Sequence, residues 1–212
     1  MRQLALVVLG VLVAVGAAAM VQRGLAAEPQ EKPDSEQPKV KKAFAFTLDD
    51  QNGKKVSLSS FRGKIVVLEW MNPDCPQSLR HYKAGTFANT FSKYKGGKKS
   101  KVVWLAINSN VYSTIEATKK FADEYKVPYP ILDDHLGRVG RIYGIKITPH
   151  IVIKGVDGAI VYSGAVDDDP KGDKEQPLNY VAQAIDELLE GKAVSVPETE
   201  PYGTNITYAK TR

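Results

Sequence analysis

The sequence predicts an α/β fold with a central mixed β-sheet flanked by helices on both faces. Short apolar runs rich in Val and Ile alternate along the chain with segments whose apolar residues repeat at helical spacing. Such alternation is typical of parallel strands that are connected by helices. An Asp-Gly turn at residues 157–158 joins two further strand-like runs, and this turn predicts an antiparallel hairpin in the same sheet.

The first half of the chain contains the predicted centre of the sheet. Residues 64–70 and 102–107 are continuous apolar runs of β-forming residues, as expected for strands covered on both faces. An alternating strand at 43–49 and an Asn-Gly turn precede them. Between the two central strands, apolar residues at helical spacing predict a helix from Pro76 onward, with a break at Gly85.

The second half of the chain continues the alternation of helices and strands. The expected elements are, in order, a helix over 113–125, an extended segment at 127–132, a short helix over 136–143, strands at 150–154 and 159–164, and a last helix over 178–190.

The folded domain is expected to cover residues 43–192, and the role of the segment that follows it is open. Residues 1–27 combine a basic start, an unbroken apolar run and small residues at their end, which is the layout of a secretory signal peptide. An uncleaved anchor is the alternative, and it would be the protein's only contact with a membrane. Residues 28–42 are rich in Pro and charge and predict a disordered linker, and residues 193–212 are a C-terminal tail. We therefore expect an exported protein, periplasmic or extracellular.

The charge balance argues against a nucleic-acid partner. The formal net charge of the whole chain is +5, and the predicted signal peptide carries Arg2 and Arg23 but no acidic residue. The folded part is therefore only mildly basic, and no surface with interleaved aromatic and basic residues is evident.

The only cysteine of the chain, Cys75, is the most informative residue. A single cysteine excludes any internal disulfide bond. Cys75 follows a predicted strand, and Pro76 fits the first position of a helix. The amino end of a helix stabilises a thiolate over a thiol. Asp74 opposes this effect, whereas Arg80 and His81 could compensate for it.

Two interpretations of Cys75 remain from the residues alone. A reactive thiol must be open to a molecule outside the protein, and its position at the start of a helix favours this interpretation. The alternative is a small buried apolar residue, which is where free cysteines usually lie.

Four segments together resemble the thioredoxin-like redoxin family, which includes alkyl hydroperoxide reductase and thiol-specific antioxidant proteins of the peroxiredoxin type. These segments are residues 46–64, residues 66–76, which end in the motif NPDCP, residues 137–153 and residues 157–170. They occur in the order of the family, and the chain resembles a single-cysteine variant of it.

The resemblance implies a set of site residues. It places Cys75 as the peroxidatic cysteine and implies a cis peptide bond between Thr148 and Pro149 against that cysteine. Asn72 takes the position where thioredoxins have their first cysteine. The predicted site therefore consists of the catalytic residues Cys75 and Asn72 and of the cleft or substrate-binding residues Trp70, Pro76, Thr148, Pro149 and His150.

The function implied is thiol redox chemistry, in which Cys75 attacks a peroxide or a disulfide. The resemblance also implies a further cysteine in a PYGC segment, where this chain has Thr204. Regeneration then requires an external thiol reductant or the thiol of a partner protein. Neither a cofactor nor a metal is expected.

Two other functions stay open. The fold could bind a peptide along residues 148–152 by strand addition without catalysis. Less favoured is copper handling by Cys75 with His81, His135 and His150, because their spacing is unlike that of a metal site.

Two groups of acidic residues have open roles. Glu69 lies inside a predicted buried strand and is either a buried base or proton relay or a side chain that points to the strand end. The run Asp167–Asp169 could bind a hard cation, but a solvated loop is the favoured interpretation.

Overall fold

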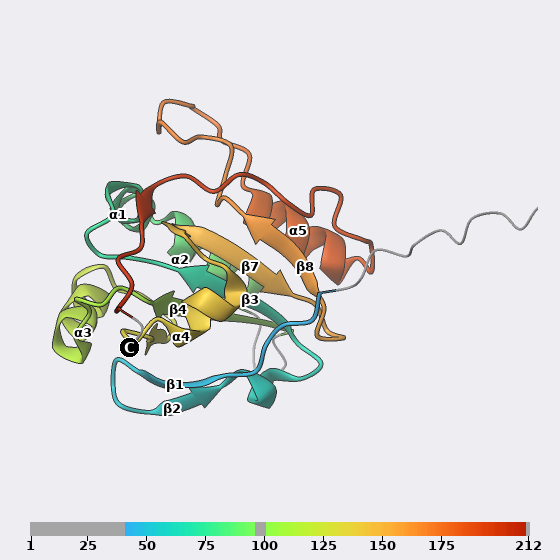
Figure 1. The fold of residues 1–212 in the computed structure, drawn as a ribbon. Coiled ribbons are helices and arrows are strands. Elements are labelled where there is room, and N and C mark those ends of the chain that lie inside the picture. Colours follow the sequence, from blue (N-terminus) through green and yellow to red (C-terminus); the bar gives the residue numbers. More distant parts are fainter. Residues whose placement is uncertain (1–40, 96–100, 211–212) are drawn as a thin grey trace, which may run out of the picture. The chain divides into compact units, whose positions relative to one another are not determined.

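A seven-stranded mixed sheet forms the centre of the structure, in the strand order β2-β1-β5-β4-β3-β7-β8 (Figure 1). Strands β3, β4 and β5 are parallel to one another, whereas β1, β2, β7 and β8 join the sheet by antiparallel pairing. The strands are β1 (Thr47–Asp50), β2 (Lys55–Ser57), β3 (Ile65–Trp70), β4 (Val102–Asn108), β5 (Ile131–Asp133), β7 (His150–Lys154) and β8 (Ile160–Gly164). The mixed α/β class predicted from the sequence is confirmed.

This computed structural model describes residues 41–95 and 101–210, which belong to the unit Lys39–Arg212. The predicted signal peptide and residues 28–40 of the predicted linker lie outside the described residues. Lys42 already pairs with Ala159 beside the sheet. Within the described part of the chain, no helix has the length and apolarity needed to cross a membrane.

Five α-helices and one 3₁₀ helix are seen among the described residues. They are η1 (Leu58–Phe61), α1 (Pro76–Lys83), α2 (Thr86–Tyr94), α3 (Ile115–Glu124), α4 (Arg138–Tyr143) and α5 (Tyr180–Leu189). The predicted break at Gly85 is confirmed: it separates α1 from α2 and has φ +70°, a value that favours glycine.

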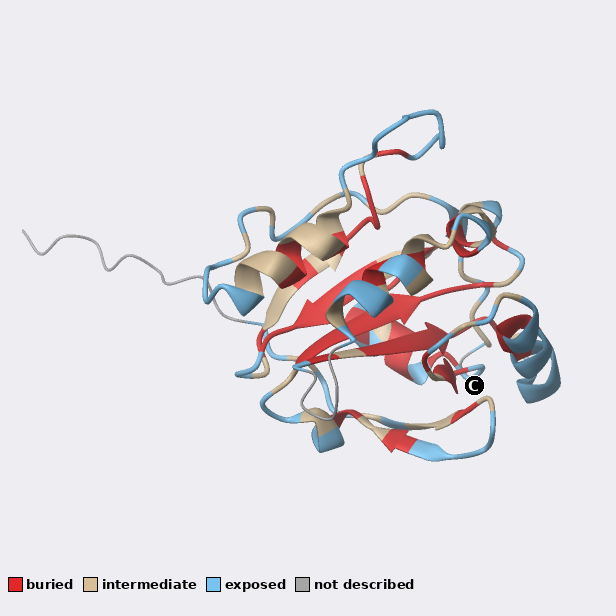
Figure 2. Ribbon diagram, turned by 180° about the vertical axis from the view of Figure 1, so that it is seen from behind, coloured by how far each residue is buried: buried red, intermediate tan, exposed pale blue. Residues whose placement is uncertain are grey.

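The central strand β3 shows why this sequence folds as two layers around a sheet. All six of its residues are buried (Figure 2), and alternate side chains enter different clusters. Val67 packs with residues of α1, α2, α3 and α5, whereas Val66 and Leu68 pack with residues of α4, β2 and η1. Burial on both faces explains the uninterrupted apolar run in the sequence.

The differences from the prediction with a clear physical reason lie near the first strand. The strand expected over 43–49 begins only at Thr47. The backbone before Thr47 forms isolated hydrogen bonds to two different segments instead of continuous pairing with one strand. Ala43 N donates to Gly158 O at 3.0 Å, and Leu58 N donates to Phe46 O at 3.1 Å. The segment after β2 forms the short helix η1, where the sequence predicts no helix or strand.

Glu69 is the one charged residue inside β3, and it lies fully buried. Its carboxyl oxygens accept hydrogen bonds from Tyr82 Oη at 2.5 Å, Trp104 Nε1 at 2.7 Å and Tyr129 Oη at 2.9 Å. These partners lie on α1, on β4 and just before β5, so the carboxyl group joins three elements to β3. Burial raises the pKa of Glu69 to about 7, and the three hydrogen bonds oppose that rise.

We predict that Glu69→Gln changes how stability depends on pH. The folded chain holds the Glu69 proton more tightly than the unfolded chain, so ionisation of this group costs stability as the pH rises from 4.5 to about 7. Because glutamine does not ionise, the unfolding free energy of the wild type relative to that of the variant should fall by about 3 kcal/mol over this range. Urea denaturation across the range measures it.

The exposed Glu116→Gln variant controls for the loss of one negative charge. A constant difference between wild type and Glu69→Gln at every pH would show that burial does not perturb Glu69.

Candidate functional site

Cys75 lies at the N-cap of α1, beyond the carboxyl end of the central strand β3. Pro76 occupies the first helical turn, as predicted. The sulfur accepts a hydrogen bond from Ser78 N at 3.5 Å. The sequence folds this way because Asn72 closes the preceding turn: its Oδ1 accepts from Asp74 N at 3.0 Å, and its backbone oxygen accepts from Cys75 N at 3.0 Å.

The loop before β7 forms the second wall of the site. The Thr148–Pro149 peptide bond is cis, as the sequence resemblance implied. Thr148 is buried, and its carbonyl oxygen lies 2.8 Å from Cys75 Sγ, where it accepts a hydrogen bond from the thiol. Residues 73 positions apart in the chain therefore meet at the sulfur.

The C-terminal tail forms the third wall, which sequence reasoning missed. Strand β9 (Thr204–Asn205) pairs antiparallel with β6 (Ile147–Thr148), so that Thr204 lies opposite Thr148. Gly203 has φ +140°, and a Cβ at this position would collide with the carbonyl group of Thr148. Only glycine permits this close approach. The available signal was that Thr204 stands where the family resemblance implied a cysteine.

The pKa of Cys75 reflects opposing effects. Burial raises it, because a thiolate loses hydration in the interior. Hydrogen bonding from the Thr204 side chain and from the backbone N–H of Ser78 outweighs burial, and the pKa of Cys75 is lowered from that of an ordinary thiol. The tail therefore contributes to the electrostatics of the site.

The tail also closes the site. Cys75 has 0% exposed surface in this structure, and the sequence-based expectation of an open thiol is wrong for this conformation. The tail and the residues before β7 cover the sulfur. Cys75 itself belongs to neither of the two large apolar clusters that pack on the sheet. Access therefore depends on displacement of the covering segment.

Tyr202 anchors the tail to α1 and to the loop after β8. Its hydroxyl donates to Asp167 Oδ1, lies 3.0 Å from His81 Nε2, and accepts from Arg80 at 3.4 Å. The Arg80 guanidinium also lies over the Tyr202 ring, 5.8 Å from its centroid. Figure 1 shows the red C-terminal segment passing close to α1. We call Arg80, His81, Asp167 and Tyr202 the tail anchor.

The tail anchor corrects two expectations. Arg80 and His81 do not compensate for Asp74 at the sulfur, because their side chains contact the tail and the acidic loop. Arg80 donates to Asp169 O at 2.6 Å, and burial lowers the pKa of His81. The acidic loop is also not simply solvated, since Asp167 and Asp169 are buried and accept hydrogen bonds.

A second set of contacts holds the tail beyond β9. Ile206 N donates to Lys146 O at 2.9 Å, and Val111 N donates to Thr207 O at 2.9 Å. Tyr208 Oη donates to Ile145 O at 2.7 Å, and Arg141 lies over the Tyr208 ring at 4.5 Å. The short strand β9 is thus held at both ends.

Two of the predicted cleft residues, Trp70 and His150, make their side-chain contacts with residues other than Cys75. Trp70 has no exposed surface; its ring packs against Tyr143, and its Nε1 donates to Ser109 Oγ at 3.1 Å. It faces the core because alternation along β3 points it there, so it does not line a cleft in this structure. His150 Nε2 lies 2.9 Å from Ser163 Oγ, and burial lowers the pKa of His150 to about 4.

The three histidines do not meet at a common point. His81 contacts Tyr202, His135 contacts Asp133, and His150 contacts Ser163. Among residues 41–95 and 101–210, no group of three or more His, Cys, Asp or Glu side chains is arranged to hold a metal ion.

Sequence comparison identifies a family and named relatives. The model of the AhpC/TSA family matches residues 40–163. Peroxiredoxin Q from Suaeda salsa is 34% identical over 105 residues, which cover 48% of this chain and 44% of that protein. Thiol-disulfide oxidoreductase ResA from Bacillus thuringiensis subsp. konkukian is 27% identical over 57% of this chain and 66% of its own length. The chain thus spans less than half the length of the peroxiredoxin Q that it matches.

Comparison with solved structures supports the fold. An uncharacterized conserved protein from Geobacillus kaustophilus has a TM-score of 0.71 and 27% identity over 82% of this chain and 94% of its own. A hypothetical protein from Sinorhizobium meliloti has a TM-score of 0.71 and 24% identity over 81% of this chain and 95% of its own. The fold is thioredoxin-like, and its structural neighbours include thioredoxin-like oxidoreductases.

We predict that Thr204→Val raises the pKa of Cys75, because valine keeps the shape of threonine but removes the hydroxyl that favours the thiolate. Titration of the thiolate absorbance in the folded protein, with Cys75→Ser as the blank, measures the change. Thr204→Ser should keep the lower pKa. An unchanged titration in Thr204→Val would remove Thr204 from the account of this thiol.

We also predict that Tyr202→Ala accelerates alkylation of Cys75. Loss of the hydroxyl and ring contacts of the tail anchor favours the opened tail, and the expected increase is about tenfold. Iodoacetamide modification followed by intact mass measures the rate. Tyr112→Ala, at a side chain that is 76% exposed, is the matched control. Equal rates in both variants would mean that the tail does not limit access.

Proposed function

Because the chain belongs to the AhpC/TSA family, we propose that it is a thiol-dependent redox protein that uses Cys75 against a peroxide or a disulfide. One observation carries this proposal. The only cysteine of the chain, Cys75, lies at the amino end of α1 and against the cis-proline loop, and the pKa of its thiol is lowered. A thiolate in this position is a nucleophile.

The chemistry needs an external thiol, since the chain has one cysteine. With a peroxide, the Cys75 thiolate takes one oxygen atom to form a sulfenic acid, and the other oxygen leaves as an alcohol or water. One external thiol then forms a mixed disulfide and releases water, and a second thiol releases Cys75 and leaves as a disulfide. With a disulfide substrate, the thiolate forms the mixed disulfide directly and one thiolate leaves.

The geometry of β9 favours a polypeptide as the partner thiol or disulfide. Beside β6 and the cis-proline loop, the tail runs as an extended strand with backbone pairing. An extended segment of another protein can use the same pairing when the tail is displaced, which is recognition by strand addition. We propose that Thr148 and Pro149 line this partner site and that Asn72 acts by holding the turn before Cys75.

A non-catalytic peptide-binding module is the second candidate. The observation that favours it is the complete burial of Cys75. In that case a partner would displace β9 and bind β6, and the sulfur would take no part. We further propose, from the N-terminal sequence, that either function operates in an exported protein.

We predict that hydrogen peroxide oxidises the wild type at Cys75 and that Cys75→Ser is inert. Intact mass should show the addition of one oxygen atom, and a small thiol present in the same reaction should yield a mixed disulfide instead. Tyr202→Ala should react faster than the wild type, because its sulfur is more often uncovered.

A separate reaction with a disulfide-containing peptide distinguishes the two substrates. If neither peroxide nor disulfide modifies Cys75, even in Tyr202→Ala, the catalytic proposal is wrong and the binding module remains.

A further inference from the structure

A pocket with a volume of about 390 Å³ lies on the described unit at the far end of the sheet from Cys75. Its lining residues come from the segment before β1, from η1 and the residue that ends it, from the last residue of β7 and from the turn between β7 and β8. They include Ala43, Ala45, Leu58, Arg62, Lys154 and Val156. β3 separates this end from Cys75, since its six residues span about 20 Å.

Lys154 is an unusual residue for this position. It lies at the end of β7, where its register partners are Val66 on β3 and Ile160 on β8, and only 5% of its surface is exposed. Its ammonium group donates to Lys64 O at 2.9 Å and to Gly155 O at 3.0 Å. An ammonium group has three donors, so two carbonyl groups satisfy part of its hydrogen-bonding capacity and none of its charge.

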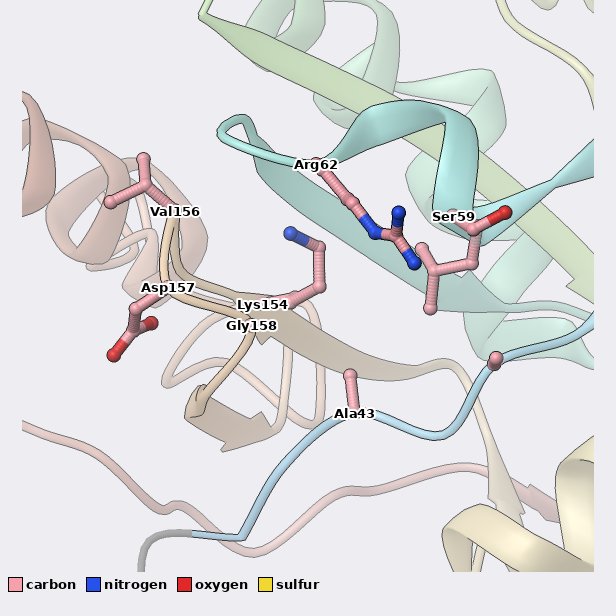
Figure 3. A pocket seen from close by; sticks show the side chains of 9 residues that line it. Ala43, Ser59, Arg62, Lys154, Val156, Asp157 and Gly158 are labelled. Atoms are coloured by element: carbon pink, nitrogen blue, oxygen red, sulfur yellow. The ribbon is translucent and has the colours of Figure 1, made fainter.

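No carboxylate of the described residues forms an ion pair with Lys154. The acid nearest in sequence, Asp157, accepts a hydrogen bond from Ala159 N at 3.0 Å within its own turn. Figure 3 shows the Asp157 side chain pointing away from the Lys154 ammonium group. Burial lowers the pKa of Lys154, whereas the charge of Asp157 acts in the opposite direction. A buried cation without a counter-ion is costly.

Arg62 supplies a second cation at the same pocket. Its guanidinium group makes no side-chain hydrogen bond or ion pair with any residue in the ranges 41–95 and 101–210. In Figure 3, the Arg62 and Lys154 side chains extend into the space between η1 and the turn that contains Val156. The pocket thus presents two cations next to apolar side chains.

We propose that this pocket binds a small organic carboxylate with an apolar body. The carboxylate would pair with the planar guanidinium of Arg62 and supply the missing counter-charge to Lys154. The apolar body would contact Ala43, Ala45, Leu58 and Val156. A volume of this size, with apolar walls and a few polar groups, is typical of small-molecule sites. The site is independent of Cys75 and of the function proposed for it.

Calorimetric titration with octanoate tests the proposal. Octanoate should bind with one equivalent per chain, and both acetate and octan-1-ol should bind at least tenfold more weakly, because each lacks one half of the recognised chemistry. Amide chemical shifts should change at Ala45, Ser59 and Gly158. Binding should persist in Cys75→Ser.

The variants separate a charged site from a merely apolar one. Arg62→Gln and Lys154→Met should each weaken octanoate binding about tenfold or more, whereas Lys120→Gln removes an exposed positive charge from α3 and should have no effect. Arg62 is exposed, so its variant should fold even if Lys154→Met does not. Octanoate binding no tighter than that of octan-1-ol, or unchanged in Arg62→Gln, would overturn the proposal.

Discussion

The pairing of β9 with β6 is the constraint on which the candidate site depends. It brings Thr204 to the sulfur of Cys75 and passes Gly203 close to the carbonyl group of Thr148. Because the pairing is only two residues long, its stability comes mainly from the contacts at either end. The tail anchor holds one end and Tyr208 holds the other. The same backbone pairing therefore positions a group that favours the thiolate and excludes solvent from it.

These two effects have opposite consequences for chemistry. Hydrogen bonding from Thr204 and Ser78 increases the fraction of Cys75 that is ionised, but a nucleophile with no exposed surface cannot reach a substrate. A partner that replaces β9 would remove the cover and the Thr204 hydroxyl together, leaving the helix amino end and the Ser78 amide to stabilise the sulfur. In the proposed function, the thiol is therefore stabilised as a thiolate while the tail covers it, and it reacts when the tail is displaced.

The sequence predicted the sheet and the position of Cys75, because each has a local signal, whereas the cis bond before Pro149 was implied by the resemblance to the redoxin family. Continuous apolar runs mark buried central strands, and proline marks the helix start. The tail could not be predicted in this way. β9 has two exposed residues and no pattern of its own, and Tyr202 finds its partners 35 and about 120 residues away. Contacts across such separations are a property of the folded chain.

Hydrogen exchange at the tail shows whether a partner bound at Cys75 displaces β9. The amide of Ile206 donates to Lys146 O, so it reports whether β9 is in place. Cys75 would first be trapped as a mixed disulfide with a short thiol-containing peptide, and exchange would be compared with that of the free protein. We expect trapping to remove the protection of residues 203–207 while the protection of β3 and β4 is kept. Unchanged protection of the tail in the trapped protein would contradict this expectation.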